Sequence, residues 1–226
     1  VKLNADGSFK KLRSRLVAKG NEQEEGVDYL ETYSPVVRMA SVRTILHMAT
    51  VLNWEIRQMD VKNAFLHGDL QEKVFMKQPA GFVDQEHPHH VWRLNKVIYG
   101  LKQAPRAWFD KFSTFLINFG FCCSKSDPSL FVYKTETDII ILLLYVDDMV
   151  ITGNSSESLD HLLKQLNSEF RMTDMGKLHY FLGIQVQTHD KGLFLCQQKY
   201  AEDLLAVARM KDCEPIPTPL PQQLNR

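Results

Sequence analysis

The chain has 226 residues, enough for one domain or two lobes that bury a sizeable core. Its 44% hydrophobic and 24% charged residues are ordinary for a soluble globular protein. A formal net charge of zero argues against a free-standing nucleic-acid-binding domain, which is usually basic. The longest apolar run, residues 139–144, is far shorter than the ~18–20 residues of a membrane helix. We therefore expect no membrane partner.

The first half of the chain predicts a mixture of short strands and one helix. Residues 9–17 alternate in part and predict a β-hairpin, and residues 41–52 predict a helix with Ser41 as its N-cap. Residues 54–59 alternate as in a half-amphipathic strand, which places Asp60 at a strand end. Two short strands are predicted around a Pro/Gly/His-rich loop, at residues 74–76 and 91–94.

The second half predicts longer elements. Residues 104–119 predict a helix with Pro105 in its first turn and Gly120 at its end. The remaining predictions are strands at residues 131–133 and 139–152, an amphipathic helix at 157–170, a hairpin formed by 180–187 and 193–196, and a short helix at 200–208. Strands separated by helices, with few parallel βαβ units, predict an α+β fold with an antiparallel sheet.

Two adjacent acids, Asp147 and Asp148, follow the apolar run 139–144 and Tyr145, and precede the β-favouring residues 149–152. The pair is therefore predicted at the tip of a hairpin. Adjacent ionised carboxylates repel each other, and a compact fold tolerates them best when a cation neutralises them. Hard oxygen ligands near substrate phosphate suit Mg²⁺. An acidic turn without a metal is the alternative.

Asp60 is the candidate third carboxylate, 87 residues before Asp147. Three acids can complete a two-metal site, with the ions ~3.5–4 Å apart around an in-line phosphoryl displacement. A shared ion pair requires Asp60 to lie within roughly 10 Å of Asp147. The alternative is that Asp60 caps a following turn or helix.

Charge and cysteine patterns are less specific. Residues 1–20 carry a net charge of +5, residues 21–31 carry −5 and residues 90–111 carry +4. The basic segments could contact phosphates, or they could be solvated faces. The four cysteines lack zinc spacing and predict reduced thiols in an intracellular protein. The cluster of His87, His89 and His90 is either a polar loop or a metal site.

Six sequence motifs occur in the order of a known family. They are residues 15–20 (RLVAKG), 29–38 (YLETYSPVVR), 60–70 (DVKNAFLHGDL), 99–108 (YGLKQAPRAW), 145–148 (YVDD) and 181–184 (FLGI). With these motifs the chain resembles the reverse transcriptase of copia-type LTR retrotransposon Pol polyproteins along nearly its whole length. The resemblance implies an RNA-directed DNA polymerase, a nucleotidyltransferase with dNTP substrates and an RNA or DNA template with a primer.

The resemblance also implies an architecture, the fingers and palm of a right-hand polymerase with an antiparallel palm sheet. Residues 1–53 and 71–98 are then mostly fingers, 54–70 and 99–196 mostly palm and primer-grip hairpin, and 197–226 the approach to a truncated thumb. The non-Met start and the Pro-rich residues 215–221 look like cuts in a longer polyprotein. The other expected partners are the thumb and ribonuclease H regions of that polyprotein. The expected location is the cytoplasm, in a virus-like particle, with access to the nucleus.

Individual roles follow from the same resemblance. The metal ligands for two Mg²⁺ ions, which Mn²⁺ can replace, are Asp60, Asp147, Asp148 and the carbonyl of Val61. The nucleotide-binding candidates are Arg13, Arg15, Asn63, Ala64, Phe65, Tyr99 and Gly100. The template and primer candidates are Lys102, Tyr145, Phe181, Leu182 and Gly183.

Three of these assignments carry their own alternatives. Phe65 resembles the aromatic residue that blocks a ribose 2′-hydroxyl, and ordinary core packing is the alternative. Arg13 stands where the family usually has Lys, so the sequence does not decide which phosphate this side chain would contact. Lys177 is a candidate general acid for the pyrophosphate leaving group, or a solvated lysine.

Three functions compete on this basis. The first is an active RNA-directed DNA polymerase domain, and the second is a truncated, inactive remnant with at most weak nucleic-acid binding. An integrase-like two-metal transferase would need an acid triad that ends on Glu, and the motif order does not fit it.

Overall fold

The computed structural model describes residues 2–3, 8–12, 14–190 and 192–214. Arg13 and the Pro-rich residues 215–221, both named above, lie outside the described residues. The fold is α+β, with four α-helices and antiparallel sheets among the described residues. Backbone contacts divide the chain into two compact units, Val1–Lys177 and Leu178–Arg226.

A six-stranded antiparallel sheet forms the centre of the first unit. Its order is β10 (Met172–Lys177), β3 (Glu55–Val61), β9 (Asp148–Gly153), β8 (Ile139–Tyr145), β7 (Leu130–Lys134) and β6 (Cys122–Cys123). The predicted strands at 131–133 and 139–152 are thus confirmed as β7 and the β8–β9 hairpin. Residues far apart in sequence meet in the middle of this sheet, where β3 pairs with β9.

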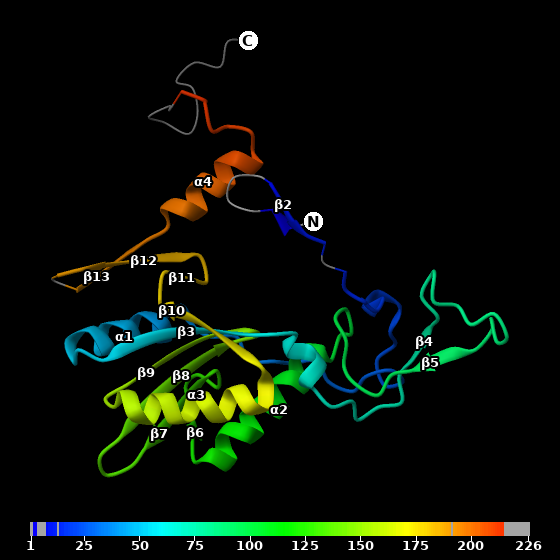
Figure 1. The fold of residues 1–226 in the computed structure, drawn as a ribbon, viewed down its shortest axis with the longest axis horizontal. Coiled ribbons are helices and arrows are strands. Elements are labelled where there is room, and N and C mark those ends of the chain that lie inside the picture. Colours follow the sequence, from blue (N-terminus) through cyan, green and yellow to red (C-terminus); the bar gives the residue numbers. More distant parts are fainter. Residues whose placement is uncertain (1, 4–7, 13, 191, 215–226) are drawn as a thin grey trace. The chain divides into compact units, whose positions relative to one another are not determined.

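Helices cover both faces of this sheet. Helix α1 (Met39–Val51) lies on one face, and α2 (Ala104–Phe119) and α3 (Ser156–Phe170) lie on the other (Figure 1). Alternate β8 residues, Ile140, Leu142 and Leu144, join the core cluster that α2 and α3 complete. Their neighbours Ile141 and Leu143 are also buried, and strand geometry directs them to the opposite face. The apolar run therefore forms a strand buried on both sides.

The ends of α2 and α3 show that local capping signals in the sequence predict helix bounds. Helix α2 has the predicted bounds, with Pro105 in its first turn and Gly120 in the left-handed region at φ 113°. Helix α3 begins at Ser156, one residue before the prediction, because the Ser155 side chain accepts the Ser158 N–H as an N-cap.

The predicted N-cap role of Ser41 is wrong. Helix α1 begins two residues earlier, after Arg38, and the Ser41 hydroxyl instead donates to the Asp127 carboxylate at 2.5 Å. The buried Asp127 also accepts the N–H groups of Arg38 and Ser129. Burial opposes its ionisation, but these three hydrogen bonds outweigh burial and lower the pKa of Asp127. A distant acid thus satisfies the start of this helix.

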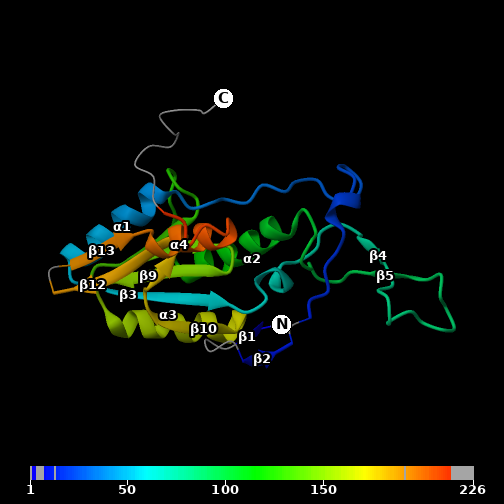
Figure 2. The same cartoon turned by 90° about the horizontal axis from the view of Figure 1, so that it is seen from above.

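The remaining elements of the first unit are short. They are β1 (Lys2–Leu3), β2 (Phe9–Lys11), the 3₁₀ helices η1 (Gly20–Glu22) and η2 (Ala64–His67), β4 (Phe75–Lys77) and β5 (Val91–Arg93). Strands β4 and β5 lie within one residue of the predicted strands 74–76 and 91–94. They pair with each other, and their loop extends away from the sheet (Figures 1 and 2). The hairpin predicted over 9–17 is misplaced. Strand β2 pairs with β1, and Val17 forms a parallel bridge with Tyr99.

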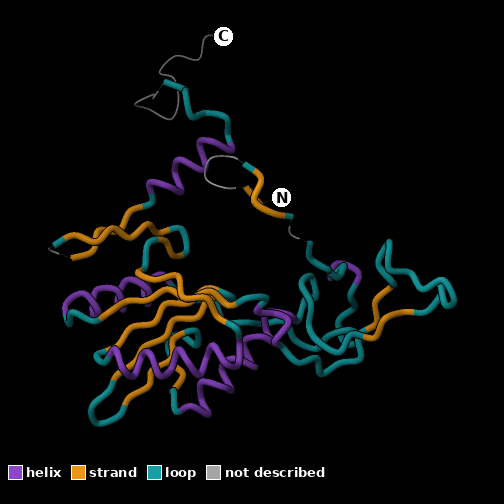
Figure 3. The backbone as a smooth tube through the Cα atoms, in the orientation of Figure 1, coloured by secondary structure: helices purple, strands orange, loops and turns teal. Residues whose placement is uncertain are grey.

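The second unit is a three-stranded antiparallel sheet followed by a helix (Figure 3). Its elements are β11 (Tyr180–Phe181), β12 (Ile184–His189), β13 (Gly192–Cys196) and α4 (Gln198–Val207). The predicted strand 180–187 is interrupted, because Leu182 and Gly183 adopt φ values of 50° and 82° and reverse the chain. Within the described part of the chain, no helix has the length and apolarity needed to cross a membrane.

Candidate active site

The three predicted acids meet at one end of the six-stranded sheet. Asp60 on β3 lies directly opposite Asp148 on β9, and Asp148 lies opposite Tyr145 on β8. The Asp147 carbonyl accepts the Val61 N–H at 2.8 Å. Directly opposed residues of antiparallel strands have Cα atoms ~4.5–5.5 Å apart. The sheet therefore closes the gap of 87 residues between Asp60 and Asp147.

Strand alternation sets the face on which the acids lie. Met59 and Val61 are buried in the core beneath α2 and α3. Because neighbouring strand residues point to opposite faces, Asp60 points to the other face, where its cross-strand partner Asp148 also lies. The acids are half-buried rather than enclosed. They are thus accessible to ligands at the sheet end.

The turn that carries Asp147 has a strained backbone. Val146 adopts φ 53°, a left-handed conformation that is an outlier for a β-branched residue. Its carbonyl accepts the indole N–H of Trp108 at 2.7 Å. The sequence offered no signal for this contact, since Trp108 occupies an ordinary apolar position of a helix. It brings α2 directly to the acid turn.

The electrostatics of this cluster favour a cation. Burial, and then the charges of Asp147 and Asp60, raise the pKa of the Asp148 carboxyl. Among the described residues, no ion pair involves Asp147 or Asp148. Carboxylate oxygens that repel one another at a half-exposed strand end fit a hard divalent ion such as Mg²⁺. In this conformation, no group of three or more His, Cys, Asp or Glu among the described residues has a metal-holding arrangement.

A further polar group adjoins the acids on strand β10. Thr173 lies opposite Asp60, and its hydroxyl is buried without a hydrogen-bond partner among the described residues. Buried hydroxyls are normally hydrogen-bonded. This oxygen can therefore bond a water or ligand beside Asp60.

Predicted nucleotide-binding residues form a cluster beside this sheet end. Strand β3 leads through Asn63, at φ 55°, into η2, where Ala64 is buried and Phe65 is half-buried. The Phe65 ring lies 4.8 Å from that of Tyr99, and the Arg15 guanidinium lies 5.3 Å from the Tyr99 ring centroid. The structure thus brings Arg15, Tyr99 and Phe65 together.

A close backbone contact holds this cluster in place. The Ala18 N–H donates to the Tyr99 carbonyl at 2.7 Å. Gly100 has φ 92°, and a Cβ there would lie 2.1 Å from the Ala18 carbonyl oxygen. Likewise a Cβ on Gly20 would lie 2.1 Å from the Gly100 oxygen. Two glycines are therefore needed for segment 15–20 to lie against residues 99–100.

Lys102, predicted to contact the template, is engaged within the chain. Its ammonium donates to the Gln23 carbonyl at 3.2 Å and to the Tyr29 hydroxyl at 3.3 Å. The neighbouring Gln103 is buried, donates to the Asp28 carbonyl and accepts from the Gln23 side chain. No pattern in the sequence singled out the two glutamines. Together these contacts fix segment 23–29 to the start of α2.

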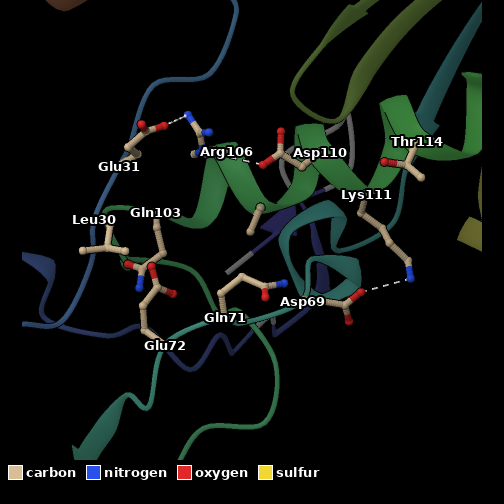
Figure 4. A pocket seen from close by; sticks show the side chains of 11 residues that line it. Leu30, Glu31, Asp69, Gln71, Glu72, Gln103, Arg106, Asp110, Lys111 and Thr114 are labelled. Carbon is tan, nitrogen blue, oxygen red and sulfur yellow. Dashed lines mark hydrogen bonds and ion pairs between the residues drawn. The ribbon is translucent and has the colours of Figure 1, made fainter.

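The basic segment 90–111 is largely neutralised by acids. Arg106 pairs with Glu31 and, at 3.6 Å, with Asp110. Figure 4 shows these pairs at the rim of a pocket of about 560 Å³. The pocket lies between α2 and the segments 30–31 and 69–72. The acidic segment 21–31 thus neutralises part of the basic segment 90–111. This favours a structural role for these basic residues over phosphate binding.

Asp69 neutralises two more bases of the same segment. Lys96 and Lys111 both pair with it, Lys111 at 3.0 Å. The hydrogen bond from Lys96, and then that from Lys111, lower the pKa of Asp69. These pairs join η2 and the loop after it to α2.

Other predicted site residues lie elsewhere or in the second unit. On strand β10, the Lys177 backbone lies directly opposite Arg57 of β3. Arg57 comes three residues before Asp60, so the Lys177 backbone is ~10 Å along the strand from the acids. In the second unit, Phe181 is buried and Leu182–Gly183 form the turn between β11 and β12. The structure therefore does not bring the Lys177 backbone to the acid cluster.

Among the residues that the structure describes, neither the histidine cluster nor the cysteines form a group that could hold a metal ion. The rings of His87 and His90 stack at 4.4 Å, and Gln78 donates to both of their carbonyls. This arrangement agrees with a polar loop before β5. All four cysteines are free thiols.

Comparison with known proteins agrees with these features. Residues 2–222 match the family described as reverse transcriptase (RNA-dependent DNA polymerase). Over 219 residues, or 97% of the chain, it is 49% and 47% identical to the retrovirus-related Pol polyproteins from transposons RE2 and RE1 of Arabidopsis thaliana. Over 229 residues, or 99% of the chain, it is 44% identical to that from transposon TNT 1-94 of Nicotiana tabacum. The chain spans only 15–17% of the length of these relatives. It belongs to the reverse transcriptase family of copia-type retrotransposon Pol polyproteins.

Proposed function

We propose that the chain is the polymerising part of an RNA-directed DNA polymerase, which adds dNTPs to a primer by two-metal phosphoryl transfer. The observation that carries this proposal is the meeting of Asp60, Asp147 and Asp148 at one sheet end, in a chain of the reverse transcriptase family. A nucleic-acid template, a primer and the remaining Pol regions are the partners that this function requires.

The acids have distinct positions in the proposed chemistry. Asp60 and Asp147 would hold both ions, with Asp148 and the Val61 carbonyl as further oxygen ligands. Two bound Mg²⁺ ions lower the pKa of a primer 3′-hydroxyl and neutralise the triphosphate and its leaving group. The protein supplies the position: Asp60 and Asp148 come from paired strands, and the turn that carries Asp147 is bonded to β3.

The cluster of Arg15, Tyr99 and Phe65 suits the incoming nucleotide. Arg15 is exposed above Tyr99, where its guanidinium can reach phosphate oxygens. Phe65 follows the acid strand within five residues and packs on Tyr99, so its ring has little freedom to move away from a sugar. Steric rejection of a 2′-hydroxyl is sufficient to separate the two sugar classes. Phe65 also packs against core residues, and the two roles are compatible.

The proposed architecture is that of fingers and palm. The six-stranded sheet with α1, α2 and α3 supports a palm over residues 54–70 and in the part of 99–196 within the first unit. The β4–β5 hairpin and the segment 14–38 would belong to the fingers. The β11–β12 turn is the proposed primer grip.

An inactive remnant is the second candidate. Two observations favour it: the net charge is zero, and Asp69, Glu31 and Asp110 pair with bases of segment 90–111. Both lower the expected affinity for a nucleic-acid backbone, which depends on phosphate contacts.

Primer extension separates these candidates. The chain, and a version extended through the thumb region of its relatives, would be incubated with primed RNA, dNTPs and Mg²⁺. Active polymerase predicts extension by the longer protein, and a loss of roughly 10²-fold or more in its Asp147→Asn variant. Asp203→Asn, on exposed α4, is the matched control. No extension by a folded longer protein, or equal extension by its Asp147→Asn variant, would contradict the polymerase.

A further inference from the structure

The acid turn contains a conformation that its own sequence disfavours. Val146 and Asp147 connect β8 to β9, and Val146 is held at φ 53°. A branched side chain rarely occupies this region, and such strain persists only where the surroundings impose it. Something outside the turn must therefore stabilise this conformation.

Two contacts anchor the turn on either side. The Asp147 carbonyl accepts the Val61 N–H at 2.8 Å, and the Val146 carbonyl accepts the Trp108 indole N–H at 2.7 Å. Consecutive carbonyls are thus bonded to strand β3 and to helix α2. With both fixed, the peptide between Val146 and Asp147 cannot rotate freely, and the direction of the Asp147 side chain is constrained.

Trp108 is itself rigidly placed. It is 1% exposed, and its ring lies 5.1 Å from Phe112, 5.4 Å from Phe170 and 5.8 Å from His67. A Cβ on Gly68 would come within 3.0 Å of the α2 backbone at residues 107–108, so a glycine there allows η2 to approach the helix closely. Three elements, α2, α3 and η2, therefore hold the indole in one position.

We propose that Trp108 is a positioning residue of the acid cluster: its indole N–H holds Val146 in the left-handed conformation and so directs the Asp147 carboxylate toward Asp60 and Asp148. The inference rests on the proposed metal-binding function of these acids. A buried indole N–H requires an acceptor, and in this fold that acceptor is a carbonyl of the acid turn. Partners that orient a ligand typically contribute 10–100-fold to metal affinity.

The test is Mn²⁺ binding to the 226-residue chain, followed by the electron paramagnetic resonance signal of free Mn²⁺. Trp108→Phe keeps an aromatic ring in the cluster and removes the N–H. We expect about tenfold weaker Mn²⁺ binding, measured well below the melting temperature, in a protein with unchanged circular dichroism. Trp92→Phe, on the distant strand β5, is the matched control and should bind as the unmodified chain does.

Two further variants separate orientation from packing. Benzothienylalanine at position 108, introduced into a Trp54→Phe, Trp92→Phe chain, keeps the shape of indole and lacks only the donor. This substitution should reproduce the tenfold loss of Mn²⁺ affinity. Because it keeps the shape of the side chain, it provides the test even if the Trp108→Phe protein does not fold. Val146→Gly removes the strain, because glycine enters the left-handed region freely. In that background, Trp108→Phe should weaken binding by less than about twofold.

The outcomes distinguish this inference from the proposed function. Unchanged Mn²⁺ affinity with benzothienylalanine, while Asp147→Asn weakens binding, overturns the role of Trp108 alone. An equal loss with and without Val146→Gly overturns the account based on strain. Mn²⁺ binding that is the same in the unmodified chain and in Asp147→Asn overturns both the inference and the proposed metal site.

Discussion

Asp148→Asn should make the protein more stable while it weakens metal binding. Asp148 lies directly opposite Asp60 and next to Asp147, and it is half-buried. Like charges directly opposed across two strands destabilise by about 0.2–1 kcal/mol, and burial adds to the cost. For a chain of this size, 1 kcal/mol corresponds to about 2–4 °C in melting temperature. We therefore expect the variant to melt about 1–4 °C higher at pH 7.5 without divalent ions.

The pH dependence of that gain has a definite sign. The pKa of Asp148 is raised in the folded state, so the folded protein binds its proton more readily than the unfolded chain does. The cost of ionised Asp148 is absent below its unfolded pKa and grows as pH rises through the folded pKa. The advantage of Asp148→Asn should therefore shrink between pH 7.5 and 4.5.

Calorimetric melting at both pH values, with and without Mg²⁺, measures these effects. Mg²⁺ should raise the melting temperature of the unmodified chain more than that of Asp148→Asn, because the ion relieves the same repulsion. Asp203→Asn is the control for removal of an exposed charge. A lower melting temperature for Asp148→Asn at pH 7.5, or a gain that does not depend on pH, would show that ionised Asp148 does not destabilise the fold.

Phe65→Val should admit ribonucleotides while deoxynucleotide incorporation stays measurable, and unchanged sugar discrimination in single-nucleotide extension would leave Phe65 with core packing alone. Gly100→Ala should cost at least about 1–3 kcal/mol in urea unfolding, since it combines a positive φ with a 2.1 Å contact to Ala18. Gly81→Ala, at φ 84° in open space, should cost less, and equal costs would contradict the role of close contact. Because the pKa of Asp127 is lowered in the folded protein, its ionised carboxylate stabilises the fold above the unfolded pKa, and this stability is lost as pH falls. Asp127→Asn should therefore reduce the loss of unfolding free energy at acidic pH. An unchanged loss at acidic pH would contradict this role of Asp127. The isolated chain should bind primer–template weakly with a modest salt slope, and binding as tight as that of a thumb-extended protein at two salt concentrations would show that the charge argument fails.

Local signals in the sequence predicted much of the first unit. Proline at the start and glycine at the end were enough to set the bounds of α2, because each residue acts on its own backbone. The continuous apolar run followed by two acids was likewise enough to predict the β8–β9 hairpin. The grouping of Asp60 with that hairpin came from the family resemblance and from charge chemistry, and the pairing of β3 with β9 agrees with it.

The features that the sequence did not reveal depend on partners distant along the chain. Ser41 looked like a helix cap, but Asp127, 86 residues later, takes its hydroxyl and satisfies the helix start instead. The Lys102 ammonium looked free for a template, but Gln23 and Tyr29 engage it. Trp108 looked like a core residue, and only the tertiary structure shows its N–H at the acid turn. A side chain whose role depends on a partner far away in the sequence produces no local periodic pattern from which that role could be predicted.

The number of Mn²⁺ ions bound by single acid variants shows whether the three carboxylates form one metal site. Asp60→Asn, Asp147→Asn and Asp148→Asn would each be titrated with Mn²⁺ beside the unmodified chain and Asp203→Asn. One shared site predicts that Asp60→Asn, 87 residues away in sequence, loses the same ions as Asp147→Asn, with affinity at least about tenfold weaker. Asp148→Asn should lose affinity at that same site, and Asp203→Asn should lose none. If Asp60→Asn binds as the unmodified chain does while Asp147→Asn does not, the three carboxylates do not form one metal site.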